Sequence, residues 1–141
     1  MINTYYVIFD TNVIVSAFLG IENGSYSAKL LDYIYEKIII PVYNEKILKE
    51  YRDVLSRDKF PFTHKMVGDF INSIKKLGIK INPKKLDIPF VDYDDLKFYE
   101  VVMNKDKYDK KLVTGNIKHF PIQKNIKTPK EMYKIINKIN E

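Results

Sequence analysis

Residues 5–12 read YYVIFDTN. The first five residues of this stretch are all aromatic or β-branched, which predicts a buried β-strand over 5–9. Asp10 follows the strand directly, and Asn12 comes two residues later. An aspartate at the end of a strand most often caps a helix or belongs to a turn. Whether Asp10 does more than this depends on what the rest of the chain brings to the same place.

Strands and helices alternate along the chain. Apolar runs predict further strands at 38–42, 79–82 and 111–114. Helical periodicity and capping residues predict helices at 13–19, 25–37, 44–57, 63–77, 94–104 (beginning at Asp94 or Asp95) and 128–139. Such alternation is typical of an α/β fold in which helices cover both faces of a parallel sheet.

The composition is that of an ordinary globular protein. The 141 residues, of which 45% are hydrophobic and 30% charged, fit one domain spanning 1–141 with its own core. No apolar run approaches the roughly 20 residues that a membrane span needs, and the first residues carry no recognisable export signal. Cysteine is absent, which excludes disulfides, thiolate metal sites and cysteine nucleophiles. These features predict a cytoplasmic protein with no membrane partner.

The positive charge is concentrated in the second half of the chain. Residues 1–70 carry eight Lys or Arg against nine Asp or Glu, whereas residues 71–141 carry sixteen against nine. Lys130, Lys134 and Lys138 recur at four-residue spacing and would form one stripe on a helix. The stripe can contact nucleic-acid phosphates or can simply be a solvated face, and the sequence favours neither.

Oxygen-bearing side chains follow two of the predicted strands. Asp10 and Asn12 come after the first strand, and Thr114 and Asn116 come at the end of the fourth. Ligands bind beyond the carboxyl ends of the strands in open parallel sheets. We therefore expect these side chains to face one crevice.

Acids on the predicted helices can join them. Glu50 lies in the helix that follows the second strand, and Asp94 and Asp95 lie at the head of a later helix. Each has a simpler explanation, since Glu50 can be a surface acid and acids in a first turn favour the helix dipole or cap the helix. Taken residue by residue, the acids leave both explanations open.

Five segments in a fixed order carry a family resemblance. They read FDTNVIVSAFL, ILKEYRDVL, DYDDLKFYEVV, LVTGNIKHFP and TPKEMYKII. In this order and spacing they closely resemble the PIN-domain family, and more narrowly its branch of toxin components of toxin–antitoxin systems. The resemblance implies a three-layer α/β/α sandwich around a short, mainly parallel sheet. It also implies metal-dependent endoribonuclease activity.

The resemblance assigns the site residues. It implies that the catalytic acids are Asp10, Glu50 and Asp95. It implies that the residues supporting them are Asn12, Asp94, Thr114 and Asn116, and that the metal ligands are Asp10, Asp95 and Asn116. The family commonly has Asp at the position of Asn116. One negative charge is therefore missing here, and the number of bound metal ions stays open.

Converging carboxylates have a physical reason to bind a metal. Without Lys or Arg to compensate them, they repel one another and raise each other's pKa unless a divalent cation neutralises them. Oxygen ligands without cysteine suit a hard ion, so the expected cofactor is Mg²⁺ or Mn²⁺. Of the two histidines of the chain, His64 is expected at the surface. His119 is expected to pack or to face solvent, and an approach to the substrate phosphate is its alternative role.

The expected partners are an RNA substrate, a cognate antitoxin protein and a second copy of the chain in a homodimer. Protein contacts would come from exposed rings among Tyr26, Tyr33, Tyr35 and Tyr51, and ordinary core packing is the alternative role for these tyrosines.

Two other functions stay open. A catalytically weakened or inactive PIN-like module that binds RNA or protein would also explain Asn116 and the basic second half. A phosphotransferase that uses Asp10 as a covalent nucleophile would need a second Asp two residues later, where this chain has Asn12. A metal ion bound between Asp10 and Asp95 would favour the nuclease over both.

Overall fold

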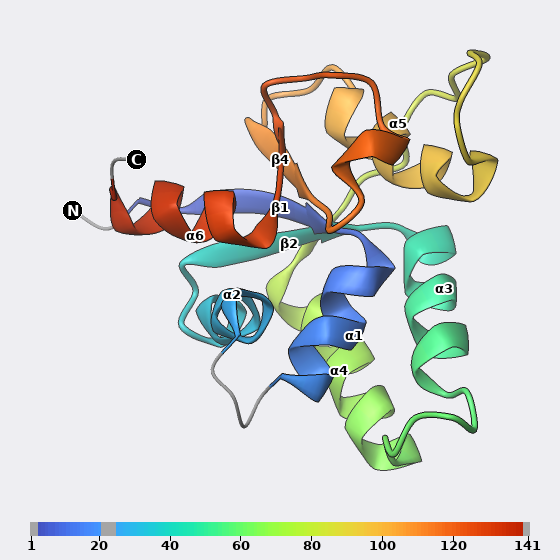
Figure 1. The fold of residues 1–141 in the computed structure, drawn as a ribbon, viewed down its shortest axis with the longest axis vertical. Coiled ribbons are helices and arrows are strands. Elements are labelled where there is room, and N and C mark those ends of the chain that lie inside the picture. The colour runs from blue at the N-terminus through green and yellow to red at the C-terminus, as the bar shows by residue number, and fades with distance from the viewer. Residues whose placement is uncertain (1–2, 21–24, 140–141) are drawn as a thin grey trace.

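Parallel strands form one sheet with helices packed on both of its faces (Figure 1). The computed structural model describes residues 3–20 and 25–139. Within these residues the strands are β1 (Tyr5–Phe9), β2 (Ile39–Tyr43), β3 (Ile79–Lys80), β4 (Lys110–Val113) and β5 (Ile126–Lys127). Their order in the sheet is β3-β2-β1-β4-β5, and every neighbouring pair is parallel. The prediction of an α/β fold around a parallel sheet is confirmed.

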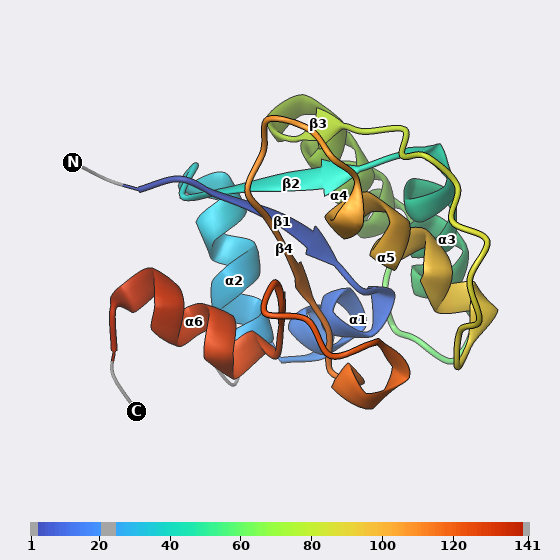
Figure 2. The ribbon, with the colours of Figure 1, turned by 90° about the horizontal axis from the view of Figure 1, so that it is seen from above.

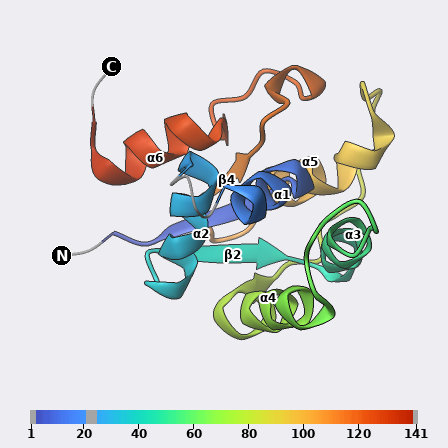
Figure 3. The same cartoon turned by 60° about the horizontal axis from the view of Figure 1, so that its bottom comes forward.

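The helices of the described residues lie in two layers. They are α1 (Thr11–Leu19), α2 (Tyr26–Tyr35), α3 (Glu45–Leu55), α4 (His64–Leu77), α5 (Leu96–Met103) and α6 (Pro129–Asn137), with the short 3₁₀ helices η2 (Tyr93–Asp95) and η3 (Ile117–His119). Helices α1, α2 and α4 cover one face of the sheet, and α5 packs on β1 and β4 from the other (Figures 1 and 2). Figure 3 shows α1 and α2 side by side over the first face. No helix in the described ranges is long and apolar enough to cross a membrane.

The central strand β1 positions the candidate site. Val7, Ile8 and Phe9 are almost fully buried, because helices cover the strand on both faces. β1 pairs in register with β4, with Phe9 opposite Val113. The Asp10 amide continues this ladder by donating to the Val113 carbonyl at 2.9 Å. The residues that follow β1 and β4 therefore emerge next to each other.

Local capping signals fix most of the helix starts. The side chains of Ser25, Asn44 and Thr63 each accept a hydrogen bond from the backbone amide three residues later, at 3.0–3.1 Å. Thr128 and Glu131 form a reciprocal capping box at the start of α6. The predicted starts of these four helices are confirmed.

The sheet differs from the prediction in β5 and in the ends of three strands. β2 is shifted by one residue toward the C-terminus, and β3 ends at Lys80 instead of at 82. β5 was not predicted, because a two-residue strand in the polar stretch around Ile126 has no periodicity of its own and forms only by pairing with β4. β4 begins at Lys110, one residue before the predicted start. Lys110 is buried, and its ammonium group bonds to the Asn104 carbonyl at 2.9 Å and to the Asp106 carboxylate. These partners offset the desolvation of its charge.

Gly78, which ends α4, is required by packing rather than by its backbone conformation. A Cβ atom at this position would lie closer than 3.0 Å to the backbone carbonyl oxygens of Pro41 and Ile74. We expect Gly78→Ala to destabilise the protein by about 2 kcal/mol or more, because backbone must move to make room.

The matched control is Gly68→Ala. Gly68 lies within α4, and a Cβ atom there meets nothing within 4 Å. This variant should gain about 0.5–1 kcal/mol, since alanine favours the helix. Urea unfolding of both variants measures the difference, and equal effects at the two positions would contradict the packing explanation.

Candidate active site

Asp10 is a buried carboxylate at the N-cap position of α1. The backbone amide of Asn12, in the first turn, has a lowering effect on the pKa of Asp10, but the side chain is not aligned for a full capping hydrogen bond. Instead Asp10 Oδ2 accepts a hydrogen bond of 2.7 Å from Thr114 Oγ1, and the whole residue is only 3% exposed. The Thr114 hydroxyl oxygen in turn accepts the Asn116 amide at 3.0 Å. The ends of β1 and β4 are thus tied together through side chains, as the sequence predicted for this edge of the sheet.

Glu50 faces this edge and is not a free surface acid. One carboxylate oxygen accepts a hydrogen bond from the Thr11 hydroxyl, and the other lies 2.7 Å from Lys97 Nζ. Asp53, one turn later on α3, is more exposed and pairs with Lys49. The Lys97 contact corrects one expectation, because Glu50 does have a compensating cation.

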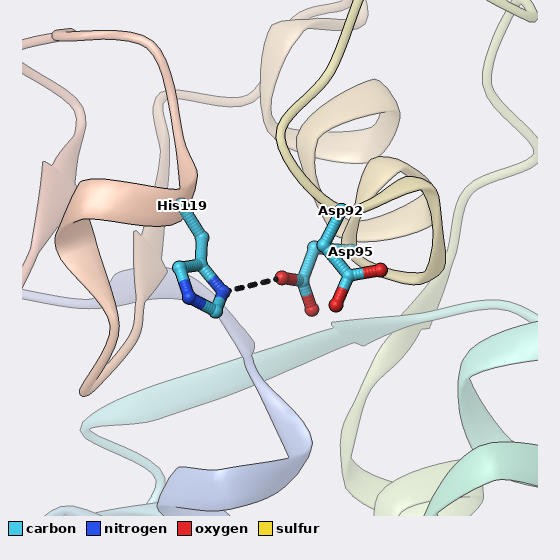
Figure 4. A group of neighbouring side chains, drawn as sticks. All are labelled: Asp92, Asp95 and His119. Atoms are coloured by element: carbon cyan, nitrogen blue, oxygen red, sulfur yellow. Dashed lines mark hydrogen bonds and ion pairs between the residues drawn. The ribbon is translucent and has the colours of Figure 1, made fainter.

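Asp95 lies at the start of α5 and is half-buried. It occupies the N-cap position of α5, but its side chain makes no capping hydrogen bond. The preceding turn is capped by Asp92, whose side chain accepts a hydrogen bond of 3.0 Å from the Asp94 amide. Asp95 Oδ2 instead lies 3.1 Å from Nδ1 of His119. Figure 4 shows this contact as a dashed line. Asp94 is exposed, and its backbone carbonyl accepts a hydrogen bond from Lys97. Of the two neighbouring acids, Asp95 is therefore the one that faces the other site residues.

Burial and neighbouring charges act on Asp10 and Asp95. Burial raises the pKa of Asp10 to about 6, against the lowering effect of the Thr114 hydrogen bond, and the charges of Asp95 and Glu50 raise it further. Partial burial also raises the pKa of Asp95, with a smaller contribution from Glu50. The structure thus brings Asp10, Glu50 and Asp95 together from three separate elements. Their chemical roles stay predictions.

Other predicted residues lie around the three acids. Thr114 is fully buried and Asn116 is half-buried at the end of β4. Asn12 is exposed in the first turn of α1. His64 is exposed at the first residue of α4, as expected.

The sequence did not identify three residues that contact the site. Lys97 binds Glu50, and the Tyr51 hydroxyl donates to the Phe9 carbonyl beneath the site. Burial, followed by the charges of Asp10 and Glu50, raises the pKa of Tyr51. His119 was expected in a surface or packing role, but it contacts Asp95. The sequence offered one signal for this contact, the position of His119 three residues after Asn116. Residues three positions apart in a 3₁₀ turn lie on the same side of the turn.

The donor groups fit a divalent cation. In the described part of the chain no cationic side chain pairs with Asp10, so the buried carboxylate lacks a counter-charge when ionised. Asp92, Asp95 and His119 offer ligand atoms that all lie within 4.8 Å of one another. Carboxylate oxygens suit Mg²⁺ and Mn²⁺, and a divalent ion would supply the missing charge.

Comparison with known proteins identifies one family. A family model described as PIN domain matches residues 6–118, which include Asp10, Glu50, Asp95 and Asn116. His119 lies one residue beyond the matched range. The comparison with curated proteins found no match, and the comparison with solved structures found none.

Proposed function

We propose that this chain, which belongs to the PIN-domain family, is a metal-dependent endoribonuclease that hydrolyses RNA phosphodiester bonds and acts as the toxin component of a toxin–antitoxin system. The family is one of Mg²⁺-dependent ribonucleases. The observation that carries the proposal is that the fold gathers Asp10, which follows β1, Glu50 of α3 and Asp95 of η2 so closely that the charges of Asp95 and Glu50 raise the pKa of the buried Asp10.

The proposed roles follow from the contacts of each acid. Asp10 and Asp95 hold the metal ion together with Asn116, and Thr114 fixes the carboxylate of Asp10 in place. The chemistry supplied by Mg²⁺ or Mn²⁺ at such a site is activation of a water molecule for in-line attack and stabilisation of the charge that builds on the phosphate. Glu50 orients the attacking water. Its two oxygens are fixed by Thr11 and Lys97, so the side chain is held ready for that task.

A basic hollow next to Glu50 supports an RNA substrate. It is lined by Glu50, Asp53, Val54 and four cationic residues, Lys46, Lys49, Arg57 and Lys97. Cations at this spacing can follow a phosphate backbone toward the acids. The hollow lies on α3 and α5, so this candidate RNA path is separate from the lysine stripe of α6.

Exposed tyrosines support a protein partner. Tyr26 and Tyr35 on α2 are 39% and 53% exposed. Tyr51 is excluded from such a surface because it is buried, and Tyr33 is half-buried with its ring stacked on Tyr133. We propose that the exposed part of α2 contacts the antitoxin or a second copy of the chain.

Cleavage of a labelled single-stranded RNA by the purified protein tests the proposed function. We expect cleavage in Mg²⁺ or Mn²⁺ and none in EDTA. Asp95→Asn should slow it by about 100-fold or more, because one ligand charge is lost. Asp69→Asn, which alters an exposed acid on α4 that pairs with Lys65, is the matched control and should cleave normally.

The same variants test the toxin role in cells. Expression of the wild-type chain in a bacterial host should stop growth, and Asp95→Asn should restore it. Cleavage that persists in EDTA would contradict the metal-dependent mechanism. RNA binding without cleavage under every metal condition would favour the inactive binding module, for which Asn116 in place of the usual acid is the supporting observation.

A further inference from the structure

His119 brings a nitrogen donor to a site otherwise made of oxygens. It ends η3, the short turn that follows Asn116, and its side chain is 42% exposed. Nδ1 of the ring points at Asp95 Oδ2 across a distance of 3.1 Å, and Asp92 lies on the same side (Figure 4). The three residues come from two segments that are 24 positions apart in sequence. The tertiary fold, and not the geometry of one local turn, brings these three side chains together.

The spacing of these donors fits one metal ion. Ligand atoms at about 2.1 Å from an octahedral ion lie roughly 3 Å apart when adjacent and roughly 4.2 Å apart when opposite. Nδ1 of His119 and Oδ2 of Asp95 are 3.1 Å apart, and the ligand atoms of Asp92, Asp95 and His119 all lie within 4.8 Å of one another. The side chains therefore need little movement to share an ion.

We propose that His119 is a direct ligand of the metal ion at this site and that its nitrogen makes the site prefer Mn²⁺ over Mg²⁺. This inference rests on the proposed metal-dependent function. Asn116 offers the site an oxygen without a charge, and the imidazole three residues later adds a nitrogen donor beside Asp95 and Asp92. Mg²⁺ requires oxygen ligands, whereas Mn²⁺ is a first-row transition metal and accepts an imidazole nitrogen more readily. The histidine thus adds a ligand that favours Mn²⁺ over Mg²⁺.

A purely structural pairing of His119 with Asp95 is the competing explanation. In that case the ring only orients the carboxylate, and its nitrogen does not touch the metal. Both explanations place the imidazole ring of His119 at a similar distance from the metal site. The decisive measurement must therefore detect a bond between nitrogen and metal.

Pulsed electron paramagnetic resonance of bound Mn²⁺ in protein labelled with ¹⁵N-histidine makes this measurement. A directly bound imidazole nitrogen couples strongly to the manganese electron spins. The chain has two histidines, so each can be removed in turn. We expect the coupling in the wild type and in His64→Gln, and we expect its loss in His119→Gln. Glutamine keeps a hydrogen-bond donor for Asp95, so the fold should be preserved.

Calorimetric titration gives a second readout. His119→Gln should reduce the ratio of Mn²⁺ affinity to Mg²⁺ affinity by about tenfold, whereas His64→Gln should leave the ratio unchanged.

The possible outcomes separate this inference from the proposed function. Tight Mn²⁺ binding without nitrogen coupling, or an unchanged affinity ratio in His119→Gln, would show that His119 is not a ligand, and the nuclease proposal would stand. Absence of Mn²⁺ and Mg²⁺ binding to the wild type would overturn both.

Discussion

Asp10→Asn should lower the rate of RNA cleavage by about 1,000-fold or more, the largest effect on activity that we expect from a single substitution. Asp10 is the most buried of the three acids and has no cationic partner in the described residues, so its charge is available to a metal ion. The amide removes that charge while keeping an oxygen that can accept the Thr114 hydrogen bond. Loss of activity should therefore reflect lost metal binding and not unfolding.

Single-turnover cleavage at saturating Mn²⁺, together with the melting temperature with and without Mn²⁺, measures both effects. The wild type should melt higher when Mn²⁺ is added, and Asp10→Asn should not. Asp69→Asn serves again as the exposed-acid control. The proposed mechanism would be wrong if Asp10→Asn cleaved RNA at the wild-type rate and the wild type gained no stability from the metal.

The second large effect is on how the folding stability of the metal-free protein depends on pH. The pKa of Asp10 is about 6 in the folded chain, because of burial, and 3.8 as the ordinary value. The folded state thus holds this proton more tightly than the unfolded state does. The contribution of Asp10 to stability is complete below pH 3.8 and is lost as the pH rises through 6. The loss amounts to about 3 kcal/mol at pH 7.

Urea unfolding of the metal-free wild type and Asp10→Asn between pH 4 and pH 7.5 measures this contribution. Other carboxylates titrate in the same range, so the difference between the two proteins is the quantity of interest. Asp10→Asn should be nearly as stable as the wild type at pH 4 and more stable by up to about 3 kcal/mol at pH 7. A role for Asp10 only as a helix cap predicts no such difference, because asparagine caps a helix as well as aspartate does.

The sequence by itself determined the features that depend on neighbouring residues. The caps at Ser25, Asn44 and Thr63 and the capping box at Thr128 were predictable because each involves a backbone amide or side chain three residues away. Continuous apolar runs predicted the buried strands β1 and β2, because only a covered sheet accommodates them. Parallel strands align their carboxyl ends, so the meeting of Asp10 with Thr114 was also predictable in outline.

The tertiary structure alone decided which side chains meet at the site. Asp94 and Asp95 are equivalent in sequence, and the turn of η2 directs Asp95 toward Asp10 while Asp94 stays exposed. The pairing of Lys97 with Glu50 and of His119 with Asp95 joins residues 47 and 24 positions apart. No local pattern encodes such contacts, because they depend on how α3, α5 and η3 pack around the ends of β1 and β4. Periodicity and capping report only the structure within one element, whereas the charge balance of this site results from the packing of several.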